Sequence, residues 1–570
     1  MVIDRPRAIA ALRAAGLALI VVVACVRVGR TWSVFSATAD EPQHIAAGIE
    51  WLGRTDTVQH EPWRTVNPPL ARVAVGLGPT LAGMQSTPVL GEALYTGPGY
   101  LRNLVLARRG VLPFLALAIV LTWVVARRAY GEPAAWVAAI AVSCIPAVLG
   151  HGGLATTDVP FTASFLLALL TLLRWIEQPT RGRAIAAGLA LGLASATKFS
   201  ALVLPLFAVL AIVARRGLGP RPGSGRQLLT QAPLTGLCAA LVVWGAYRFA
   251  VAAPATLWRP EWLQDTVGAC FPSERGRHAA AWLLGRRLPA PTAFLAALGL
   301  CAQEAPGRST AYLFGQLSQS GFPAFFPIAI AVKLPLPLAA LAIAGFVAVL
   351  RERASPELRF RALAPVLAIV TYLAMVIPSR TNIGVRHVLP VFPLIAMLAG
   401  HGAVTLWRSN RWRVAARVAA GAALLWTLAI PFAAAPDYFP WFNALAGRHP
   451  ERILIDSDLD WGQDLLRLER ALADRHADHV SIAYFGASEI CRHPLPRLTW
   501  LRPREPAHGL IAISETFRRG IDGSYYRNGD PCDRGQLVGT FVPDVKQYAW
   551  LDAHQPVARV GASILLYDIP

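Results

Sequence analysis

Two adjacent acids, Asp40 and Glu41, stand where a carboxylate could take part in chemistry, soon after the first long apolar run of the chain. The apolar residues that follow, Ile45 and Ile49, have helical spacing, so Asp40 begins an amphipathic helix close to an apolar surface. In one interpretation Asp40 caps this helix and Gln43 completes a capping box. In the other, desolvation raises the pKa of the carboxylate and makes it a better general base. The spacing leaves both interpretations open.

A third acid, Asp158, lies in a short hairpin between two apolar runs, where a carboxylate is costly without a role or a partner. It either caps the following helix or faces a functional site. Four cationic or titratable side chains are expected at the same face of the protein, namely Lys198, Lys333, Arg386 and His387. Snorkelling explains each of them singly, but as a group they could bind a lipid-linked phosphate.

Lysine is rare in this chain, which makes each lysine informative. Of the 54 basic residues only three are lysine, namely Lys198, Lys333 and Lys546. A chain that uses arginine by default can keep a lysine where a compact ammonium group is needed. Codon bias explains the same pattern equally well, so the lysines alone do not identify a site.

A structural role is the favoured interpretation of two further motifs. The sequence Asn67-Pro68-Pro69-Leu70 is typical of a rigid turn between helices. The acid-rich stretch Asp456–Asp464 invites comparison with a calcium loop, but an EF-hand needs Gly at its sixth position and an acid at its twelfth. Trp461 and Arg467 occupy those positions here, so we expect a strand-to-helix turn.

The elements that position these residues are mostly membrane helices. The 570-residue chain is 55% apolar and 15% charged, and its mean hydropathy is +0.44. Soluble domains average about 25% charged residues, so neither a soluble globule nor a disordered chain fits this composition. About eleven apolar runs approach the length of a spanning helix. They are 11–27, 110–126, 134–150, 159–173, 184–197, 199–214, 229–250, 326–350, 362–378, 388–406 and 415–435.

The basic residues predict how these helices are oriented. With the N-terminus in the cytoplasm, every expected inside loop carries arginines, as the positive-inside rule requires. The segments 28–109, 251–325 and 436–570 then lie outside. The net charge of +20 is explained by this topology, so nucleic-acid binding is not expected.

The chain divides into two predicted domains. Residues 1–435 form a membrane domain with the two outside loops, and residues 436–570 form an extracytoplasmic α/β domain. A series of β-rich runs around one helical pattern at 464–473 indicates the second domain. The β-rich runs are 452–455, 480–485, 509–513 and 557–567.

Four of the seven cysteines fall in segments that we place outside. Disulfides could form between Cys270 and Cys301 and between Cys491 and Cys532, although spacing alone establishes neither. The other three cysteines lie in apolar runs and are expected to be inert core residues.

Taken in order, these motifs resemble the lipid-carrier-dependent glycosyltransferases of the GT-C class. Within that class the chain is similar to family 39, the protein O-mannosyltransferase-like enzymes, and to the aminoarabinose transferases of lipid A. The resemblance covers most of the chain, about residues 10–490. The matching elements are Asp40-Glu41-Pro42-x-His44, Asn67-Pro-Pro-Leu70, Thr157-Asp158-Val-Pro160, Ala196-Thr197-Lys198-Phe199, Lys333-Leu-Pro335-Leu-Pro337, Gly384-Val-Arg386-His387-Val-Leu-Pro390 and Asp456-Ser-Asp-Leu-Asp-Trp461-Gly462-Gln463.

The resemblance implies a polytopic α-helical GT-C-like fold and an inverting transfer of a sugar from a polyprenyl-phosphate donor to an acceptor outside. The family's catalytic acid maps onto Asp40, with Glu41 beside it, and its carrier-binding cations map onto Lys198 and Arg386. A base would take the proton of the acceptor hydroxyl, and the cations would stabilise the leaving phosphate. The other expected substrate-binding residues are His44, Asn67, Asp158, Lys333 and His387.

Two departures from the family pattern concern the acceptor and a metal. The family usually has His-Pro-Pro-Leu where this chain has Asn67-Pro-Pro-Leu70, and the tail lacks the β-trefoil of eukaryotic mannosyltransferases. The expected partners are therefore the polyprenyl-phosphate sugar, membrane lipid, and a protein, lipid or glycan acceptor. No nucleotide is required, and the sequence leaves open whether a divalent metal takes part. The expected location is the plasma (inner) membrane.

Two other classes of protein fit some of these features. A transporter or lipid flippase also combines membrane helices with a few buried ions. Such proteins usually contain internal repeats, and we find none between the two halves of this sequence. A receptor-like module built on the tail would leave Asp158 and Lys198 without a role. We therefore expect an enzyme.

Overall fold

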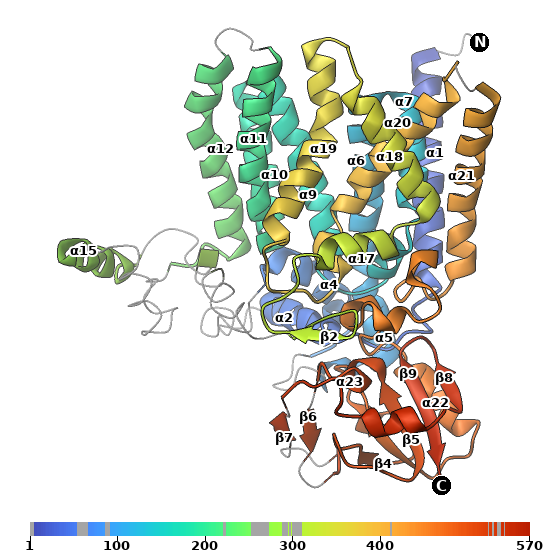
Figure 1. The fold of residues 1–570 in the computed structure, drawn as a ribbon. Helices are drawn as coiled ribbons and strands as arrows, with labels where there is room; N and C mark the ends of the chain where they lie inside the picture. The colour runs from blue at the N-terminus through green and yellow to red at the C-terminus, as the bar shows by residue number, and fades with distance from the viewer. Residues whose placement is uncertain are drawn as a thin grey trace.

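The computed structural model places a bundle of long helices at one end of the molecule and a small sheet-containing domain at the other (Figure 1). The structure describes residues 5–570 apart from 54–66, 86–91, 220–223, 252–272, 288–293, 296–297, 299–309, 411–412, 523, 527–528, 533–536 and 541.

The bundle is built from the apolar runs. Within the described residues, seven helices are long and apolar enough to cross a membrane, or nine if each of two bent pairs forms one span. The seven are Ala8–Gly29, Tyr100–Tyr130, Asp158–Glu177, Phe199–Leu218, Gly225–Ala246, Pro356–Val376 and Arg413–Ala434. In the helix numbering of Figure 1 the bundle comprises α1 (Arg5–Gly29), α5 (Tyr100–Arg109), α6 (Leu112–Tyr130), α7 (Glu132–Val142), α8 (Pro146–Gly152), α9 (Asp158–Glu177), α10 (Arg181–Ser195), α11 (Val203–Leu218), α12 (Ser224–Ala246), α17 (Phe325–Lys333), α18 (Leu336–Leu350), α19 (Pro356–Val376), α20 (Val391–Trp407) and α21 (Arg413–Ala434).

Prolines explain the two bent pairs. α7 and α8 meet at 60°, and Ile145, the residue before Pro146, is extended. α17 and α18 meet at 114°, and Leu334, the residue before Pro335, is extended as well. A residue before proline is disfavoured in the helical region, so the helix ends there. All eleven expected runs contain helices; outside the two bent pairs, α10 and α20, with 15 and 17 residues, are the shortest of them.

Two helices at the sheet-domain end of the bundle pack tightly, and the first acidic motif lies at the start of one of them. α2 (Glu41–Leu52) and α4 (Pro69–Leu81) lie beneath the bundle, on the side of the sheet domain (Figure 1). A Cβ on Gly48 would lie 2.0 Å from the backbone oxygen of Arg72, and one on Gly76 would lie 2.6 Å from Gly48. Only glycine allows this approach, which fixes α2 and its preceding residue Asp40 against α4.

The C-terminal domain is a five-stranded mixed sheet in the order β4-β3-β5-β9-β8. β3 pairs in parallel with β4 and β5, and β9 pairs antiparallel with β5 and β8. The helices α22 (Leu465–Ala473) and α23 (Glu515–Arg518) belong to this domain. The strands are β3 (His479–Ala483), β4 (Arg497–Trp500), β5 (Gly509–Ser514), β8 (Ala558–Val560) and β9 (Ile564–Ile569).

The domain has the predicted α/β character, but its strands differ from the predicted runs in three places, one of which is the unpredicted strand β4. The expected strand at 452–455 is wrong, because η6 (Pro450–Arg452) and the buried Leu454 form an irregular connection there. The expected run 557–567 is two strands, since Gly561 turns the chain with a positive φ of 58°. Two small antiparallel pairs complete the described strands: β1 (Ala311–Leu313) with β2 (Gln316–Ser318), and β6 (Ser524–Tyr526) with β7 (Leu537–Thr540).

Candidate active site

The carboxylate of Asp40 is bonded to the guanidinium of Arg386. Asp40 stands directly before α2, but its side chain makes no capping hydrogen bond. Its Oδ2 instead accepts a hydrogen bond from Nη1 of Arg386, which belongs to the short helix η4 (Val385–Val388) between α19 and α20. The side chain of Asp40 is 32% exposed and that of Arg386 is 9% exposed. The capping interpretation is therefore wrong for this geometry, and the carboxylate remains accessible.

The pair sets the protonation of both partners. Burial raises the pKa of Asp40, but the charges of Arg386 and His44 and the hydrogen bond from Arg386 hold it below its usual value. The expectation that apolar neighbours would leave this pKa raised is therefore wrong, because a guanidinium lies against the carboxylate. Burial lowers the pKa of Arg386, but Asp40 and Asp158 raise it above its usual value.

A second ion pair lies next to the first. Nζ of Lys198 donates to Oδ1 of Asp158 at 2.6 Å, and Oγ1 of Thr156 donates to Oδ2 at 3.0 Å. Asp158 is the first residue of α9, and Lys198 directly precedes η3 (Phe199–Leu202). The side chain of Asp158 is 1% exposed and that of Lys198 is 12% exposed. The charge of Asp158 acts on both Asp40 and Arg386, so the second ion pair lies close to the first.

The two expected site histidines are neutral at physiological pH. Burial and the charge of Arg72, whose Nε donates to Nδ1 at 3.4 Å, lower the pKa of His44 to about 4. Burial and the charges of Lys198 and Arg386 lower the pKa of His387 well below its usual range. The charges of Asp158 and Arg386 act on both histidines, which therefore lie near the ion pairs.

Glu41, although adjacent to Asp40, is held in a separate buried network. Nε and Nη2 of Arg108 donate to its two carboxylate oxygens at 2.8 Å each, and both side chains are 0% exposed. The backbone amides of Thr38 and Ala155 donate to the same carboxylate at 2.8 and 2.7 Å. These contacts favour a structural role for Glu41. The sequence analysis did not single out Arg108, which is 67 residues away in the chain.

Two other expected substrate-binding residues lie outside the cluster. Nζ of the buried Lys333 donates to the backbone oxygens of Phe439 and Asp458 and lies 3.8 Å from the ring centroid of Phe442. It therefore ties α17 to the connection that leads into the sheet domain. Asn67 lines a small pocket between α2, α4 and α12. The other lining residues are Ala47, Glu50, Trp51, Pro69, Arg72 and Tyr247.

The acids of the stretch Asp456–Asp464 have separate partners. Asp458 accepts from the backbone amide of Val385 at 3.0 Å, and Asp460 accepts from Oγ of Ser514 at 2.6 Å. Asp456, with a positive φ of 55°, lies close to the Asp40–Arg386 pair. Burial raises its pKa to about 7; Arg386 opposes this shift, and Asp40 and Asp458 add to it.

No metal-binding arrangement is found among the described side chains. In that part of the chain, no three His, Cys, Asp or Glu residues are grouped so that they could hold a metal ion.

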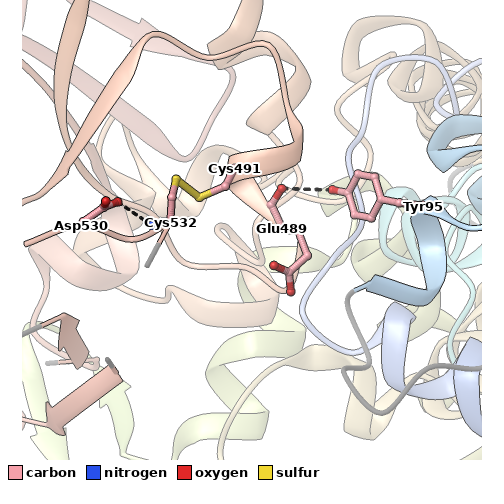
Figure 2. Close-up of a disulfide and its surroundings, with 5 residues drawn as sticks. All are labelled: Tyr95, Glu489, Cys491, Asp530 and Cys532. Carbon is pink, nitrogen blue, oxygen red and sulfur yellow. Dashed lines mark hydrogen bonds between the residues drawn. A yellow bond between two sulfur atoms is a disulfide. The ribbon is translucent and has the colours of Figure 1, made fainter. Parts of the chain in front are cut away.

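One of the two expected cysteine pairs is a disulfide (Figure 2). Cys491 and Cys532 are bonded in the sheet domain, with their Cα atoms 5.5 Å apart. Beside this disulfide, the hydroxyl of Tyr95 donates to the backbone oxygen of Glu489 at 3.3 Å, which joins the segment between α4 and α5 to this domain. Cys270 and Cys301 lie outside the described residues.

Comparisons with known proteins agree with the expected class. Residues 109–250 match the family model of dolichyl-phosphate-mannose-protein mannosyltransferase. This segment includes Asp158 and Lys198 but neither Asp40 nor Arg386. No curated protein matches the chain in sequence.

Among solved structures, ArnT from Cupriavidus metallidurans bound to undecaprenyl phosphate is 14% identical, with a TM-score of 0.48, over 96% of this chain and 97% of that one. The oligosaccharyltransferase AglB from Archaeoglobus fulgidus, in complex with an inhibitory peptide and a dolichol-phosphate, is 15% identical, with a TM-score of 0.47. That match covers 73% of this chain and 55% of AglB, so the chain spans about half the length of that protein. At this level of similarity neither structure assigns a role to a residue here.

Proposed function

We propose that this chain, a membrane glycosyltransferase of the GT-C class, moves a sugar from a polyprenyl-phosphate donor to an acceptor. The acceptor lies on the side of the membrane that bears the C-terminal sheet domain, which we therefore call the outer domain. The observation that carries the proposal is the Asp40–Arg386 pair beside the Asp158–Lys198 pair. A single site thereby offers a partly exposed base and two cations, which is what transfer from a phosphate leaving group requires.

Each group has a defined part in the proposed step. The acceptor hydroxyl attacks the anomeric carbon, and its proton passes to the carboxylate of Asp40. As the new carbon–oxygen bond forms, the bond from the anomeric carbon to the phosphate breaks, and the phosphate leaves with the electron pair. Lys198 and Arg386 stabilise that negative charge. Direct attack from the face opposite the phosphate inverts the anomeric configuration.

Donor binding would also activate the base. While Arg386 is bonded to Asp40, it holds the pKa of the carboxylate low, and a carboxylate with a low pKa is a poor base. A donor phosphate competes with Asp40 for the same guanidinium, because arginine binds phosphate and carboxylate through the same donors. When Arg386 binds the donor phosphate instead of Asp40, the proton affinity of Asp40 rises.

We assign the donor phosphate to the two cations, Lys198 and Arg386. The acceptor is a protein, a lipid or a glycan.

The orientation of the chain is part of the proposal. The N-terminal helix begins at the end of the bundle opposite the sheet domain (Figure 1), so an N-terminus in the cytoplasm puts the sheet domain outside the plasma (inner) membrane. The Cys491–Cys532 disulfide supports this placement, since disulfides persist in oxidising compartments. Residues 1–435 would then be the membrane domain and 436–570 the extracytoplasmic domain.

A membrane assay with labelled polyprenyl-phosphate sugars tests the function. We expect label to leave the lipid fraction, beginning with the mannose donor that the family description names. A transporter or lipid flippase would move the labelled lipid across the membrane and leave its sugar–phosphate bond intact. Label that stays lipid-linked for every sugar of the panel contradicts the proposal.

A further inference from the structure

We infer that Trp461 is a positioning residue of the transfer site, which holds both partners of the Asp40–Arg386 pair through the outer domain. The inference rests on the proposed function and adds a role for the motif Asp456–Asp464, which sequence analysis treats as a turn. Trp461 would act by positioning Arg386 to bind the donor phosphate.

The indole ring supports the guanidinium directly. The central carbon of the Arg386 guanidinium lies 4.3 Å from the centroid of the Trp461 ring, a cation–π contact in which Trp is the most favourable partner. Trp461 is 1% exposed and stacks on Phe439, with ring centroids 5.9 Å apart and planes inclined by 15°. The ring is thus fixed in a small apolar cluster at the junction of the two domains.

The contact matters because Arg386 has few other restraints. Its Nη1 is bonded to Asp40, and within the described part of the chain its Nε has no hydrogen-bond partner. The guanidinium is therefore held by Asp40 at one edge and by Trp461 at its face. When a donor phosphate draws Arg386 from Asp40, the indole face is the restraint that remains.

The backbone of the same residue holds the segment before Asp40. The oxygen of Trp461 accepts a hydrogen bond from the amide of Ala39 at 3.0 Å. Two residues further along, the oxygen of Gln463 accepts from the amide of Ser36 at 3.0 Å. The side chain of Gln463 in turn accepts from the amide of Trp461 at 2.8 Å, which fixes the local turn. One residue thus contacts Arg386 with its ring and the neighbour of Asp40 with its backbone.

The loop that carries Arg386 is held by the same motif. Asp458 accepts from the amide of Val385 at 3.0 Å, and Oγ of Ser457 donates to the backbone oxygen of Ile383. Gly384 between them has a φ of 146°, and a Cβ there would lie 2.1 Å from Oγ of Ser457. Both ends of the Asp40–Arg386 pair therefore depend on the motif.

The motif is anchored in the sheet domain by its remaining acids. Oγ of Ser514, at the end of β5, and the amide of Thr516 donate to Asp460 at 2.6 and 2.8 Å. Oγ of Ser563 donates to Asp464 at 2.8 Å. The outer domain thereby supports the geometry of a site whose reacting groups lie in the membrane domain and its outer loops.

A double-mutant cycle tests the inference on the full-length protein. Trp461→Leu, Arg386→Ala and the double variant are compared by the rate at which polyprenyl-phosphate mannose releases its sugar. We expect Trp461→Leu to lower kcat/KM for the donor roughly 10-fold, and we expect Trp461→Phe to stay within about threefold of the parent. In the Arg386→Ala background, Trp461→Leu should cause little further loss. Trp500→Leu removes another buried tryptophan of the sheet domain, on β4, and it should lower thermal stability while changing donor kcat/KM less than about threefold.

Binding provides a readout that does not depend on sugar transfer. In native mass spectrometry with polyprenyl phosphate alone, Trp461→Leu and Arg386→Ala should weaken binding, and the double variant should be no weaker than Arg386→Ala. The positioning role would be overturned if Trp461→Leu matched the parent in activity and binding. It would also be overturned if the losses of the two single variants multiplied in the double variant. Either result would leave the proposed function in place. A parent that neither releases sugar from any donor nor binds polyprenyl phosphate overturns the proposed function and this inference with it.

Discussion

Asp40 and Arg386 are bonded to each other although 346 residues separate them in the chain. Asp40 ends the loop that follows α1, and Arg386 lies between α19 and α20, so the first and last parts of the membrane domain meet at this pair. The partly exposed carboxylate and the nearly buried guanidinium make the contact a place where a charged substrate can exchange with one partner.

Lys198→Arg should impair transfer, because the ammonium of Lys198 lies 2.6 Å from Asp158 in a setting that leaves it only 12% exposed. A guanidinium is larger and planar, and it cannot replace a compact ammonium at that place. We expect a loss of roughly 10-fold or more in the rate of donor cleavage. Lys546→Arg, at an exposed lysine of the outer domain, is the matched control and should be silent. Full activity of Lys198→Arg would remove the argument for a specific ammonium.

Glu41→Gln should destabilise the fold. The carboxylate of Glu41 and the guanidinium of Arg108 are both fully buried, and removing one partner leaves an uncompensated charge. Breaking such a pair costs about 3–5 kcal/mol, which thermal unfolding in detergent would register as a lower midpoint. Arg504→Met breaks an exposed pair with Asp544 and should change stability by at most about 1 kcal/mol. A Glu41→Gln protein of parental stability that no longer transfers sugar would instead place Glu41 in the chemistry.

Much of the site could be predicted from residue types and their order. The motifs indicated Asp40, Asp158, Lys198 and Arg386, because acids and cations at the ends of apolar runs are costly without a role. What the sequence could not provide is which acid meets which cation. The pairing reversed the expected pKa shift of Asp40, since burial without Arg386 would have raised it.

Long-range contacts also explain why the roles of two residues and the position of one strand were predicted poorly. Glu41 and Lys333 resemble site residues in sequence, but Arg108 and the backbone around Phe439 bind them elsewhere. The strand β4 (Arg497–Trp500) was missed because prolines at 494, 496 and 503 surround it, and it forms only by pairing with β3. Local patterns carry no information about such partners.

Thermal stability should fall as the pH rises towards about 7, in part through Asp456. Its pKa is raised from 3.8 to about 7 in the folded protein, so between these values the folded state binds a proton that the unfolded state has lost. The stabilisation from this proton is therefore complete below pH 3.8, and it is lost as Asp456 ionises near pH 7. The charged groups that face it are Arg386, Asp40 and Asp458.

Unfolding midpoints measured across this pH range in the parent and in Asp456→Asn check the assignment. The variant should have a shallower fall in stability with rising pH, because Asn does not titrate. Asp552→Asn, at a side chain that is 67% exposed, should leave the slope as in the parent. Identical slopes in the parent and Asp456→Asn would show that Asp456 keeps an ordinary pKa.

A reporter fused after Pro570 should be active only when it requires the extracytoplasmic compartment. The reason is that the sheet domain ends the chain at the opposite end of the bundle from the N-terminus and contains the Cys491–Cys532 disulfide (Figure 1). A paired reporter that works only in the cytoplasm is the control. Activity of the cytoplasmic reporter alone would invert the proposed topology.

The central claim is that Asp40 accepts the proton of the acceptor, and the variant Asp40→Asn tests it most directly. Asn keeps the size of the side chain and frees Arg386, so folding and the binding of polyprenyl phosphate should be retained. Removing a general base typically lowers a rate by about 10²–10⁴-fold. We predict a loss of that size in sugar release from the labelled donor, with unchanged expression and thermal midpoint. An Asp40→Asn enzyme that transfers sugar within a few-fold of the parent rate would contradict the account.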